Sequence, residues 1–205
     1  MKRSYFFVRH GRAVYQEKGF VRAEHPPGLD FPLSEAGRLQ AREVAPRVLR
    51  LGVTRVVSSE LARARETASA IAEAGRLAFG HRIGALNEIH PTSLKVNPPG
   101  DASERWSFWD GYLAARAVRR IVATGKPVTG WELRPVEDRI LGVLRRLDEI
   151  ADPRIAVVGH GYWILLASLL VRGPVRYRWI ENCSVTRIDA DGEGRYRLVS
   201  FASVL

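Results

Sequence analysis

Cysteine is almost absent from this chain of 205 residues, because Cys183 is the only one. A single thiol cannot form an internal disulfide, and it cannot supply the several thiolates of a structural zinc site. We therefore expect packing alone to hold the core. That is feasible, since a chain of this length buries roughly 70% of the surface that it exposes when unfolded. A hydrophobic content of 46% excludes a largely disordered chain.

Long hydrophobic runs are also missing. The apolar stretch near the amino end is interrupted at Arg9 and His10, which leaves it too short for the core of a signal peptide. The longest later run, residues 162–171, has about half the length of a membrane span. We therefore expect a cytoplasmic protein with no targeting segment and no membrane partner.

Lysine is scarce although the chain is basic. It occurs four times among the 32 basic residues, so 28 are arginine, and the formal net charge is +10. The arginines are spread along the chain among Asp and Glu, which indicates compositional bias rather than a nucleic-acid surface. We therefore do not expect nucleic acid as a partner. Arginine forks bind phosphate well, so the composition favours small anionic molecules.

Short apolar segments alternate with longer helical patterns. Predicted strands are residues 4–8, 53–58, 82–86 and 155–159, with a terminal hairpin at 185–189 and 195–201. Predicted helices are residues 33–52, 60–74, 103–124, 135–151 and 160–171. The alternation predicts an α/β fold with three α/β/α layers, in which helices cover both faces of a mostly parallel central sheet.

Single residues mark the expected ends and irregularities of two helices. Ser34 is suited to cap the start of the helix at 33–52, and Gly52 is suited to end it. Pro46 lies inside the same pattern and predicts a kink or a division into two pieces. Gly75 is expected to close the following helix.

Polar residues follow three of the predicted strands. In parallel sheets, ligands bind outside the carboxyl ends of the strands. We therefore expect residues that are distant in the sequence to meet at one edge of the sheet. They are Arg9, His10, Gly11, Arg63, His160 and Gly161.

This set of side chains suits the chemistry of a phosphoryl group. Nearby arginines disfavour a second positive charge and would keep the imidazoles neutral, and a neutral imidazole is a nucleophile. Guanidinium groups bind phosphoryl oxygens bidentately. Helices that begin near Glu60 and after His160 would aim positive ends at the same edge. The edge is therefore predicted to hold a phosphoryl group and to attack it with nitrogen.

Four motifs resemble the histidine phosphatase superfamily in its phosphoglycerate mutase-like branch. Their order is the family's order, and they cover most of the chain. The resemblance implies a phosphoglycerate mutase-like fold and a single domain over residues 1–205, with a substrate-covering insertion at about 89–135. The motifs are Arg-His-Gly at 9–11, SELARARETA at 59–68, Gly-His-Gly at 159–161 and Asn-Cys-Ser-Val-Thr at 182–186.

The resemblance also implies roles at the phosphoryl group. His10 would be the nucleophile that becomes phosphohistidine, and His160 would donate a hydrogen bond to a phosphoryl oxygen. Arginine side chains and glycine backbone would hold the remaining oxygens. No metal or cofactor would be needed, because arginines and helix termini carry the charge. The phosphate-binding residues would be Arg9, Gly11, Arg63 and Gly161.

Glu88 would be the general acid that protonates the leaving group and later the base that activates water. A positioned acid of this kind contributes about 10²- to 10⁴-fold. Glu104 and Asp110 are the alternatives for this role. The other histidines, His25, His81 and His90, have no motif around them and are interpreted as surface or loop residues.

The chain also departs from the mutases of the family. Gln16 stands where they usually have Asn, and the glycine- and Trp-containing stretch that commonly follows the catalytic Glu is absent. Gln16, Trp106 and Trp109 are candidate substrate contacts. We therefore expect a phosphatase acting on a small phosphomonoester or a phosphopeptide. A phosphoglycerate mutase and a non-catalytic phospholigand-binding module are the alternatives. The oligomeric state stays open, a homodimer included.

Overall fold

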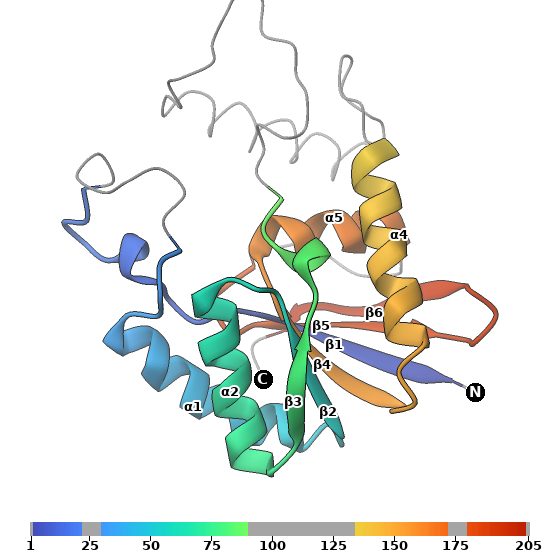
Figure 1. Cartoon of the computed structure of the whole chain (residues 1–205), viewed down its shortest axis with the longest axis horizontal. Helices are drawn as coiled ribbons and strands as arrows, with labels where there is room; N and C mark the ends of the chain where they lie inside the picture. The colour runs from blue at the N-terminus through green and yellow to red at the C-terminus, as the bar shows by residue number, and fades with distance from the viewer. Residues whose placement is uncertain (1, 22–29, 90–133, 172–179, 204–205) are drawn as a thin grey trace, which may run out of the picture.

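The computed structural model of the protein describes residues 2–21, 30–89, 134–171 and 180–203. Within these ranges, six strands form one sheet in the order β3-β2-β4-β1-β5-β6 (Figure 1). The first four pair in parallel, and β5 and β6 are antiparallel, which confirms the mostly parallel sheet. The strands are β1 (Arg3–Arg9), β2 (Arg55–Ser58), β3 (Ala78–Arg82), β4 (Arg154–Gly159), β5 (Val185–Ala190) and β6 (Tyr196–Ser203).

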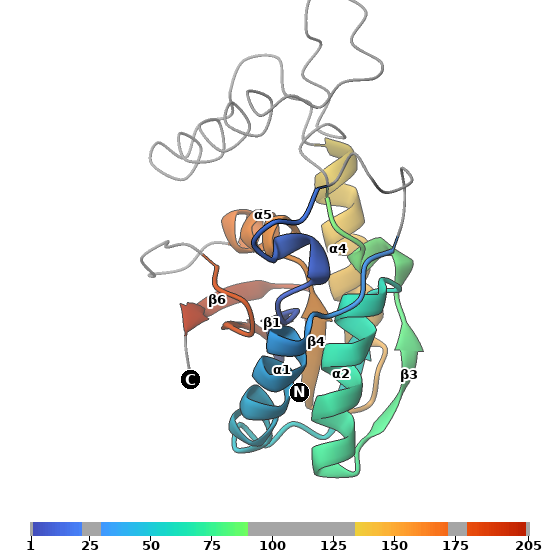
Figure 2. The ribbon, with the colours of Figure 1, turned by 90° about the vertical axis from the view of Figure 1, so that its left-hand side faces the viewer.

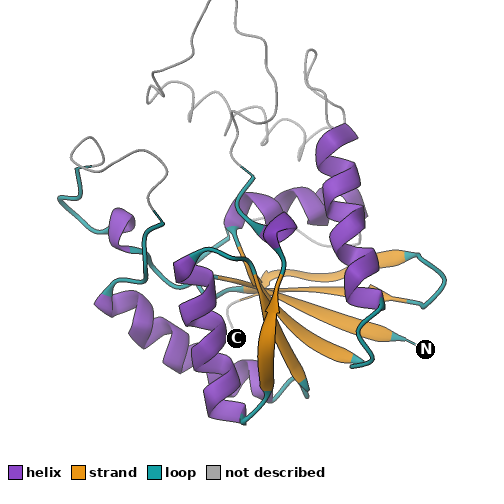
Figure 3. Cartoon of the chain, in the orientation of Figure 1, coloured by secondary structure: helices purple, strands orange, loops and turns teal. Residues whose placement is uncertain are grey.

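Helices cover both faces of the sheet, which confirms the predicted three layers (Figure 3). Helices α1 (Glu35–Leu49) and α2 (Ala62–Gly75) pack side by side on one face (Figure 2). Helices α4 (Arg134–Asp148) and α5 (Gly161–Val171) cover the other face. None of the helices in the described ranges is long and apolar enough to cross a membrane.

Strand β1 shows why the predicted strands are continuously apolar. Successive side chains of a strand point to opposite faces of the sheet. Phe6 and Val8 pack with α1 and α2, whereas Tyr5 and Phe7 pack with α4 and α5. Because both faces are covered, every position between residues 5 and 8 is buried.

The strand predicted at residues 82–86 is wrong. The strand is β3, which ends at Arg82, and Gly84–Leu86 forms a 3-10 turn. β3 is an edge strand whose side chains are mostly exposed, so it lacks the apolar pattern of its neighbours. Ile83 before the turn and Leu86 at its end are buried, so the apolar residues of this segment serve the turn and not a strand.

Helix α1 runs through Pro46 without a break, so the expected division into two pieces is wrong. Pro46 lies in the last turn, where the loss of one backbone donor affects few hydrogen bonds. The start of the helix is confirmed, because the Ser34 hydroxyl accepts a hydrogen bond of 3.2 Å from the Gly37 N–H.

Helix α2 differs from its prediction at both ends. It begins at Ala62 rather than near Glu60, and the left-handed residue at its end is Arg76, with φ of 51°. Gly75 has a packing role instead, since a Cβ there would lie 2.5 Å from Leu49 Cδ2.

The loop after β1 crosses the first turn of α1 at very short range. A Cβ on Gly37 would lie 1.9 Å from the carbonyl oxygen of Arg12, and a Cβ on Gly11 would lie 2.5 Å from that of Gly37. Both atoms are backbone and cannot move aside as a flexible side chain would. The loop that carries His10 is therefore seated directly on α1.

We predict that Gly37→Ala lowers the free energy of unfolding by about 2 to 3 kcal/mol, because overpacking at this crossing forces the backbone apart. Gly142→Ala in α4 is the matched control, since a Cβ there meets no atom within 4 Å. It should stabilise the protein by up to about 1 kcal/mol through helix propensity. Urea denaturation of both variants measures the difference, and equal stabilities would contradict the close crossing.

Candidate active site

Neighbouring parallel strands place the two predicted histidines together. His10 follows β1 and His160 follows β4, and these strands pair with Arg9 opposite Gly159. The backbone N–H of His10 donates to the Gly159 carbonyl at 3.0 Å. The imidazole centroids lie 5.1 Å apart, and neither residue is more than 1% exposed. The predicted convergence of the two histidines is confirmed.

The hydrogen bonds of His10 assign its tautomer. Its Nδ1 lies 2.7 Å from the carbonyl oxygen of Gly11, which can only accept. The proton therefore sits on Nδ1, and Nε2 carries a lone pair. Arg63 donates from Nε to that Nε2 at 3.3 Å. The ring is therefore fixed with its lone pair facing the Arg63 guanidinium, and a neutral imidazole nitrogen with a lone pair can act as a nucleophile.

The pKa of His10 is held well below its ordinary value. Burial is the main cause, and the positive charges of Arg63 and Arg9 lower the pKa further. The sequence predicts a neutral imidazole from the arginines alone. The structure confirms that the arginines lower the pKa of His10. Desolvation lowers the pKa more, because the ring is almost completely enclosed.

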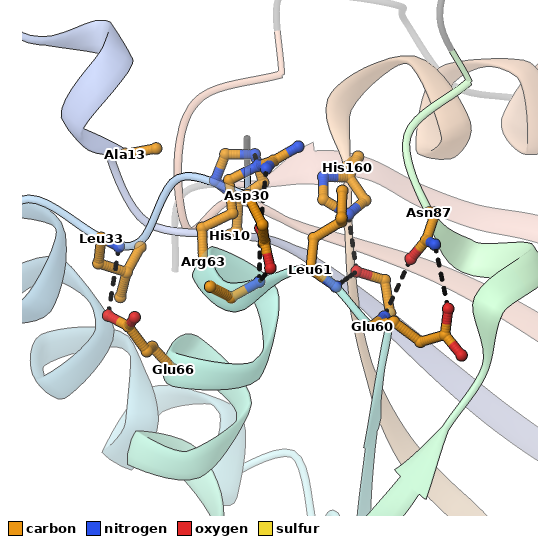
Figure 4. A network of polar contacts seen from close by, with 12 residues as sticks. His10, Ala13, Asp30, Leu33, Glu60, Leu61, Arg63, Glu66, Asn87 and His160 are labelled. Atoms are coloured by element: carbon orange, nitrogen blue, oxygen red, sulfur yellow. Dashed lines mark hydrogen bonds and ion pairs between the residues drawn. The ribbon is translucent and has the colours of Figure 1, made fainter. Parts of the chain in front are cut away.

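Two arginines bring positive charge to the histidines. Arg63 lies in the first turn of α2, is 7% exposed and stacks its guanidinium 5.4 Å from the centre of the Tyr15 ring. Arg9 ends β1 and donates from Nη1 to the carbonyl of Ile180. Figure 4 shows Arg63 beside His10 at the start of α2. Both predicted arginines therefore reach the site.

Asp30 is a site residue that the sequence pattern does not reveal. Both of its carboxylate oxygens accept from the backbone N–H of Ala62, at 2.9 and 2.8 Å, and one lies 3.9 Å from Arg63 Nη1 (Figure 4). Leu61 at the N-cap position has no side-chain oxygen, so Asp30 supplies one from another segment. The first N–H of α2 is therefore paired with Asp30 within the protein.

His160 is buried, as His10 is. Its Nε2 lies 2.7 Å from the hydroxyl oxygen of Ser59. Burial lowers the pKa of His160 well below the ordinary value, and the neighbouring His10 ring and the charges of Arg63 and Arg9 lower the pKa further. This imidazole is therefore also neutral.

Glu88 joins the same cluster from the segment after the 3-10 turn. Its Oε1 accepts from the backbone N–H of Trp163 at 3.3 Å and from that of Ile89 at 3.2 Å. The carboxyl group therefore lies at the start of α5. Burial raises the pKa of Glu88 to about 7, although these hydrogen bonds and the charges of Arg63 and Arg9 oppose the shift. A carboxyl group of this kind can give and accept a proton near neutrality.

Two side chains from the helical layer hold the turn that leads to Glu88. Arg139 Nε and Trp163 Nε1 both donate to the carbonyl of Ala85, at 2.8 and 2.9 Å. Arg139 also donates from Nη2 to the carbonyl of Asn87. The sequence analysis missed both residues, because a bond to a backbone carbonyl leaves no motif.

The side chain of Gln16 is hydrogen-bonded to neighbouring segments of the protein. Its Oε1 accepts from the Ala13 N–H at 2.9 Å and from Asn182 Nδ2 at 3.4 Å. The Asn182 amide also donates to the carbonyl of His10 at 2.9 Å. Asn182 therefore ties Gln16 to the backbone of His10, and a contact of Gln16 with substrate stays a prediction.

The two glycines differ in their surroundings. The Gly11 N–H donates to the Thr67 hydroxyl at 3.1 Å, so it is bonded within the protein. A Cβ on Gly161 would make an ordinary contact of 3.5 Å with Arg9 Nε. Phosphate binding by either glycine stays a prediction.

Several predicted residues lie outside the described ranges. Among the motif-free histidines, His81 is exposed as expected, whereas the other two are not described. The described residues contain no group of three or more His, Cys, Asp or Glu side chains placed to share a metal ion. The undescribed predictions are Trp106, Trp109, Glu104, Asp110, His25 and His90.

We predict that Glu88→Gln stabilises the protein more at about pH 8 than at about pH 4.5. Below its ordinary value of 4.5 the carboxyl is protonated in both states. As the pH rises from 4.5 to about 7, the unfolded chain releases this proton while the folded carboxyl still holds it, so the wild-type fold loses stability across this range. The amide of the variant does not ionise, so the variant does not lose this stability. The free energy of unfolding gained by the substitution should therefore differ by about 1 to 3 kcal/mol between the two pH values. Urea denaturation measures it, and a pH-independent difference would contradict the raised pKa.

Comparisons with known proteins agree with this geometry. The sequence matches the family model of the Histidine phosphatase superfamily (branch 1) over residues 5–203. A probable phosphoglycerate mutase of Escherichia coli is 27% identical over 191 residues, covering 90% of this chain and 83% of the relative.

Two solved structures share the fold. A mycobacterial glucosyl-3-phosphoglycerate phosphatase is 22% identical, with a TM-score of 0.66, over 98% of this chain and 99% of that one. A phosphoglycerate mutase from Bacillus anthracis is 20% identical, with a TM-score of 0.68, over 98% of this chain and 93% of that one. Together with the family match, which takes in both histidines, both arginines and Glu88, they show that the chain belongs to the histidine phosphatase superfamily.

Proposed function

We propose that the protein is a metal-independent phosphatase that hydrolyses a phosphomonoester through a phosphohistidine on His10. The observation that carries the proposal is the state of His10. Its ring is buried and neutral, its Nδ1–H is bonded to the Gly11 carbonyl, and the lone pair of Nε2 faces Arg63. A nitrogen nucleophile beside a guanidinium is suited to attack on a phosphoryl group whose oxygens the guanidinium binds.

In the first step, His10 Nε2 forms a bond to phosphorus while the bond from phosphorus to the leaving oxygen breaks. Glu88 gives its proton to that oxygen, so the leaving group departs as an alcohol. Arg9 and Arg63 balance the negative charge of the phosphoryl oxygens, and His160 donates a hydrogen bond to one of them. These preorganised charges would allow the reaction to proceed without a metal ion.

In the second step, water attacks the phosphorus of phosphohistidine and the bond from phosphorus to nitrogen breaks. The Glu88 carboxylate takes a proton from the water, and His10 returns to its neutral state. A pKa of about 7 suits both duties, since the protonated and ionised forms are both populated near neutrality.

Phosphoglycerate mutase activity is the alternative and is compatible with the same family. A mutase must protect its phosphoenzyme from water while the intermediate turns over in the site. Gln16, at the position where mutases usually have Asn, is bonded to Ala13 and Asn182. We propose the phosphatase on this ground, with a small phosphomonoester or a phosphopeptide as substrate. The cytoplasmic location and the absence of nucleic-acid and membrane partners stay predictions.

We predict that His10→Ala abolishes hydrolysis of p-nitrophenyl phosphate in the presence of EDTA, because His10 Nε2 carries the lone pair that faces the Arg63 guanidinium. Acid-labile phosphate should be trapped on the wild-type protein and be lost in the variant. His81→Ala, which changes an exposed histidine on β3, is the matched control and should keep both. Phosphate trapped on His160 instead of His10 would overturn the assignment. Activity lost in EDTA and restored by a divalent ion would overturn the metal-free mechanism.

We predict that Glu88→Gln slows alkyl phosphates by about 10²-fold or more relative to aryl phosphates. An aryl oxide leaves without help, whereas an alkoxide needs a proton. Phosphohistidine should still form from the aryl substrate, because the groups that hold the phosphoryl oxygens remain. Glu149→Gln, an exposed change in the turn after α4, serves as the control. Equal losses on both substrates would move the acid to Glu104 or Asp110.

A further inference from the structure

Ser59 links the end of β2 to the second histidine. It is fully buried, and its hydroxyl oxygen lies 2.7 Å from His160 Nε2 (Figure 4, dashed line at His160). Its backbone N–H donates to the Val158 carbonyl of β4 at 3.0 Å. The hydroxyl is therefore held in place by the sheet that also positions His160.

The partners of the Ser59 hydroxyl decide the direction of this hydrogen bond. The backbone N–H of Leu61 donates to the same oxygen at 3.4 Å, so the oxygen already accepts there. Among the described residues, the one acceptor for the hydroxyl proton is His160 Nε2. A buried hydroxyl proton without an acceptor costs free energy, so the satisfied arrangement has Ser59 donating to Nε2.

The consequence for His160 concerns its other nitrogen. When Nε2 of a neutral imidazole accepts, the proton of the ring sits on Nδ1. Nδ1 is buried and has no hydrogen-bond partner within the described ranges. The ring centre lies 5.1 Å from that of His10. The ring therefore carries an unpaired donor next to the candidate nucleophile.

We propose that Ser59 is a positioning residue that holds His160 in the Nδ1–H tautomer and so makes it a hydrogen-bond donor to the phosphoryl group. The proposal rests on the proposed function, because the phosphoryl group to which His160 would donate is that of the proposed substrate. Ser59 touches neither phosphorus nor substrate and acts through His160. The Nδ1 proton stays on the ring throughout, so the step is a hydrogen bond and not a proton transfer.

The opposite tautomer would work against the reaction. It would present a lone pair to an oxygen that gains negative charge in the transition state, and two acceptors repel. Both rings therefore carry their proton on Nδ1, but they would present different nitrogens to the phosphoryl group. A carbonyl, which only accepts, fixes the proton of His10 on Nδ1 and leaves the lone pair on Nε2. A hydroxyl that donates leaves His160 with a proton to offer.

The first test reads the tautomer directly in the full-length wild-type protein. With ¹⁵N-labelled histidine, long-range proton–nitrogen spectra distinguish protonated from unprotonated ring nitrogens. We expect Nδ1 of His160 to be protonated and Nε2 to be unprotonated, with a shift of the Nδ1–H signal when inorganic phosphate is added. A protonated Nε2 in the wild-type protein would overturn the proposal, whether or not the protein hydrolyses any phosphate.

The second test compares three variants by the same spectra, by kinetics on p-nitrophenyl phosphate and by melting temperature. Ser59→Ala should populate both tautomers and lower kcat by about tenfold or more. The complete loss of one donor to a transition-state oxyanion costs about 10²- to 10³-fold, and a mixture of tautomers keeps part of the donor. Ser59→Thr keeps the hydroxyl and should keep the tautomer. Ser58→Ala is the matched control, because this neighbouring buried serine donates to the Ser59 carbonyl at 2.8 Å and not to a histidine.

The outcomes separate the two proposals. An unchanged tautomer and an unchanged kcat in a folded Ser59→Ala variant would contradict the role of Ser59. Equal losses of kcat in Ser58→Ala and Ser59→Ala, with parallel falls in melting temperature, would show that Ser59 has only a structural role. A wild-type protein with the expected tautomer but no phosphatase activity would overturn the proposed function and leave the tautomer assignment standing. If Ser59→Ala does not fold, the spectra of the wild-type protein still test whether His160 is in the Nδ1–H tautomer.

Discussion

The parallel pairing of β1 with β4 is the contact on which the candidate site depends. Its register sets Arg9 opposite Gly159, so the chains leave the sheet together and carry His10 and His160 to the same point. Both strands are covered by helices, and the histidines that follow them are enclosed as well. The pairing therefore determines the distance between the imidazoles and also the low-dielectric surroundings that keep them neutral.

Enclosure has a different effect on each ionisable group. It lowers the pKa of both histidines and raises the pKa of Glu88, because in every case it disfavours the charged form. The result is a cluster of neutral or nearly neutral groups beside two permanent cations, Arg9 and Arg63. Such a cluster has positive charge for an anionic group and a lone pair for phosphorus. Asp30 at the start of α2 lies 3.9 Å from Arg63 Nη1 and partly balances that charge.

Backbone contacts between distant segments give the site its shape. Gly11 and Gly37 allow the His10 loop to lie against α1, and Asn182 holds the carbonyl of His10 from the loop before β5. Asp30 caps α2, which presents Arg63. Each of these contacts joins residues that are at least 25 positions apart, so each depends on the completed fold.

The three-layer fold, the parallel sheet and the histidines and arginines of the site could all be predicted from the order of the residues. Apolar runs at residues 4–8 and 155–159 mark strands buried on both faces, and their carboxyl ends carry His10 and His160. The Ser34 cap could be predicted as well, because its hydrogen bond spans three residues. Sequence patterns were misleading at β3, whose exposed edge has no apolar pattern, and at Pro46, whose cost depends on its place near the helix end. The tautomers of the histidines, the raised pKa of Glu88 and the partners of Asp30 and Ser59 became known from the folded chain, because burial and hydrogen-bond direction depend on surroundings assembled from distant segments.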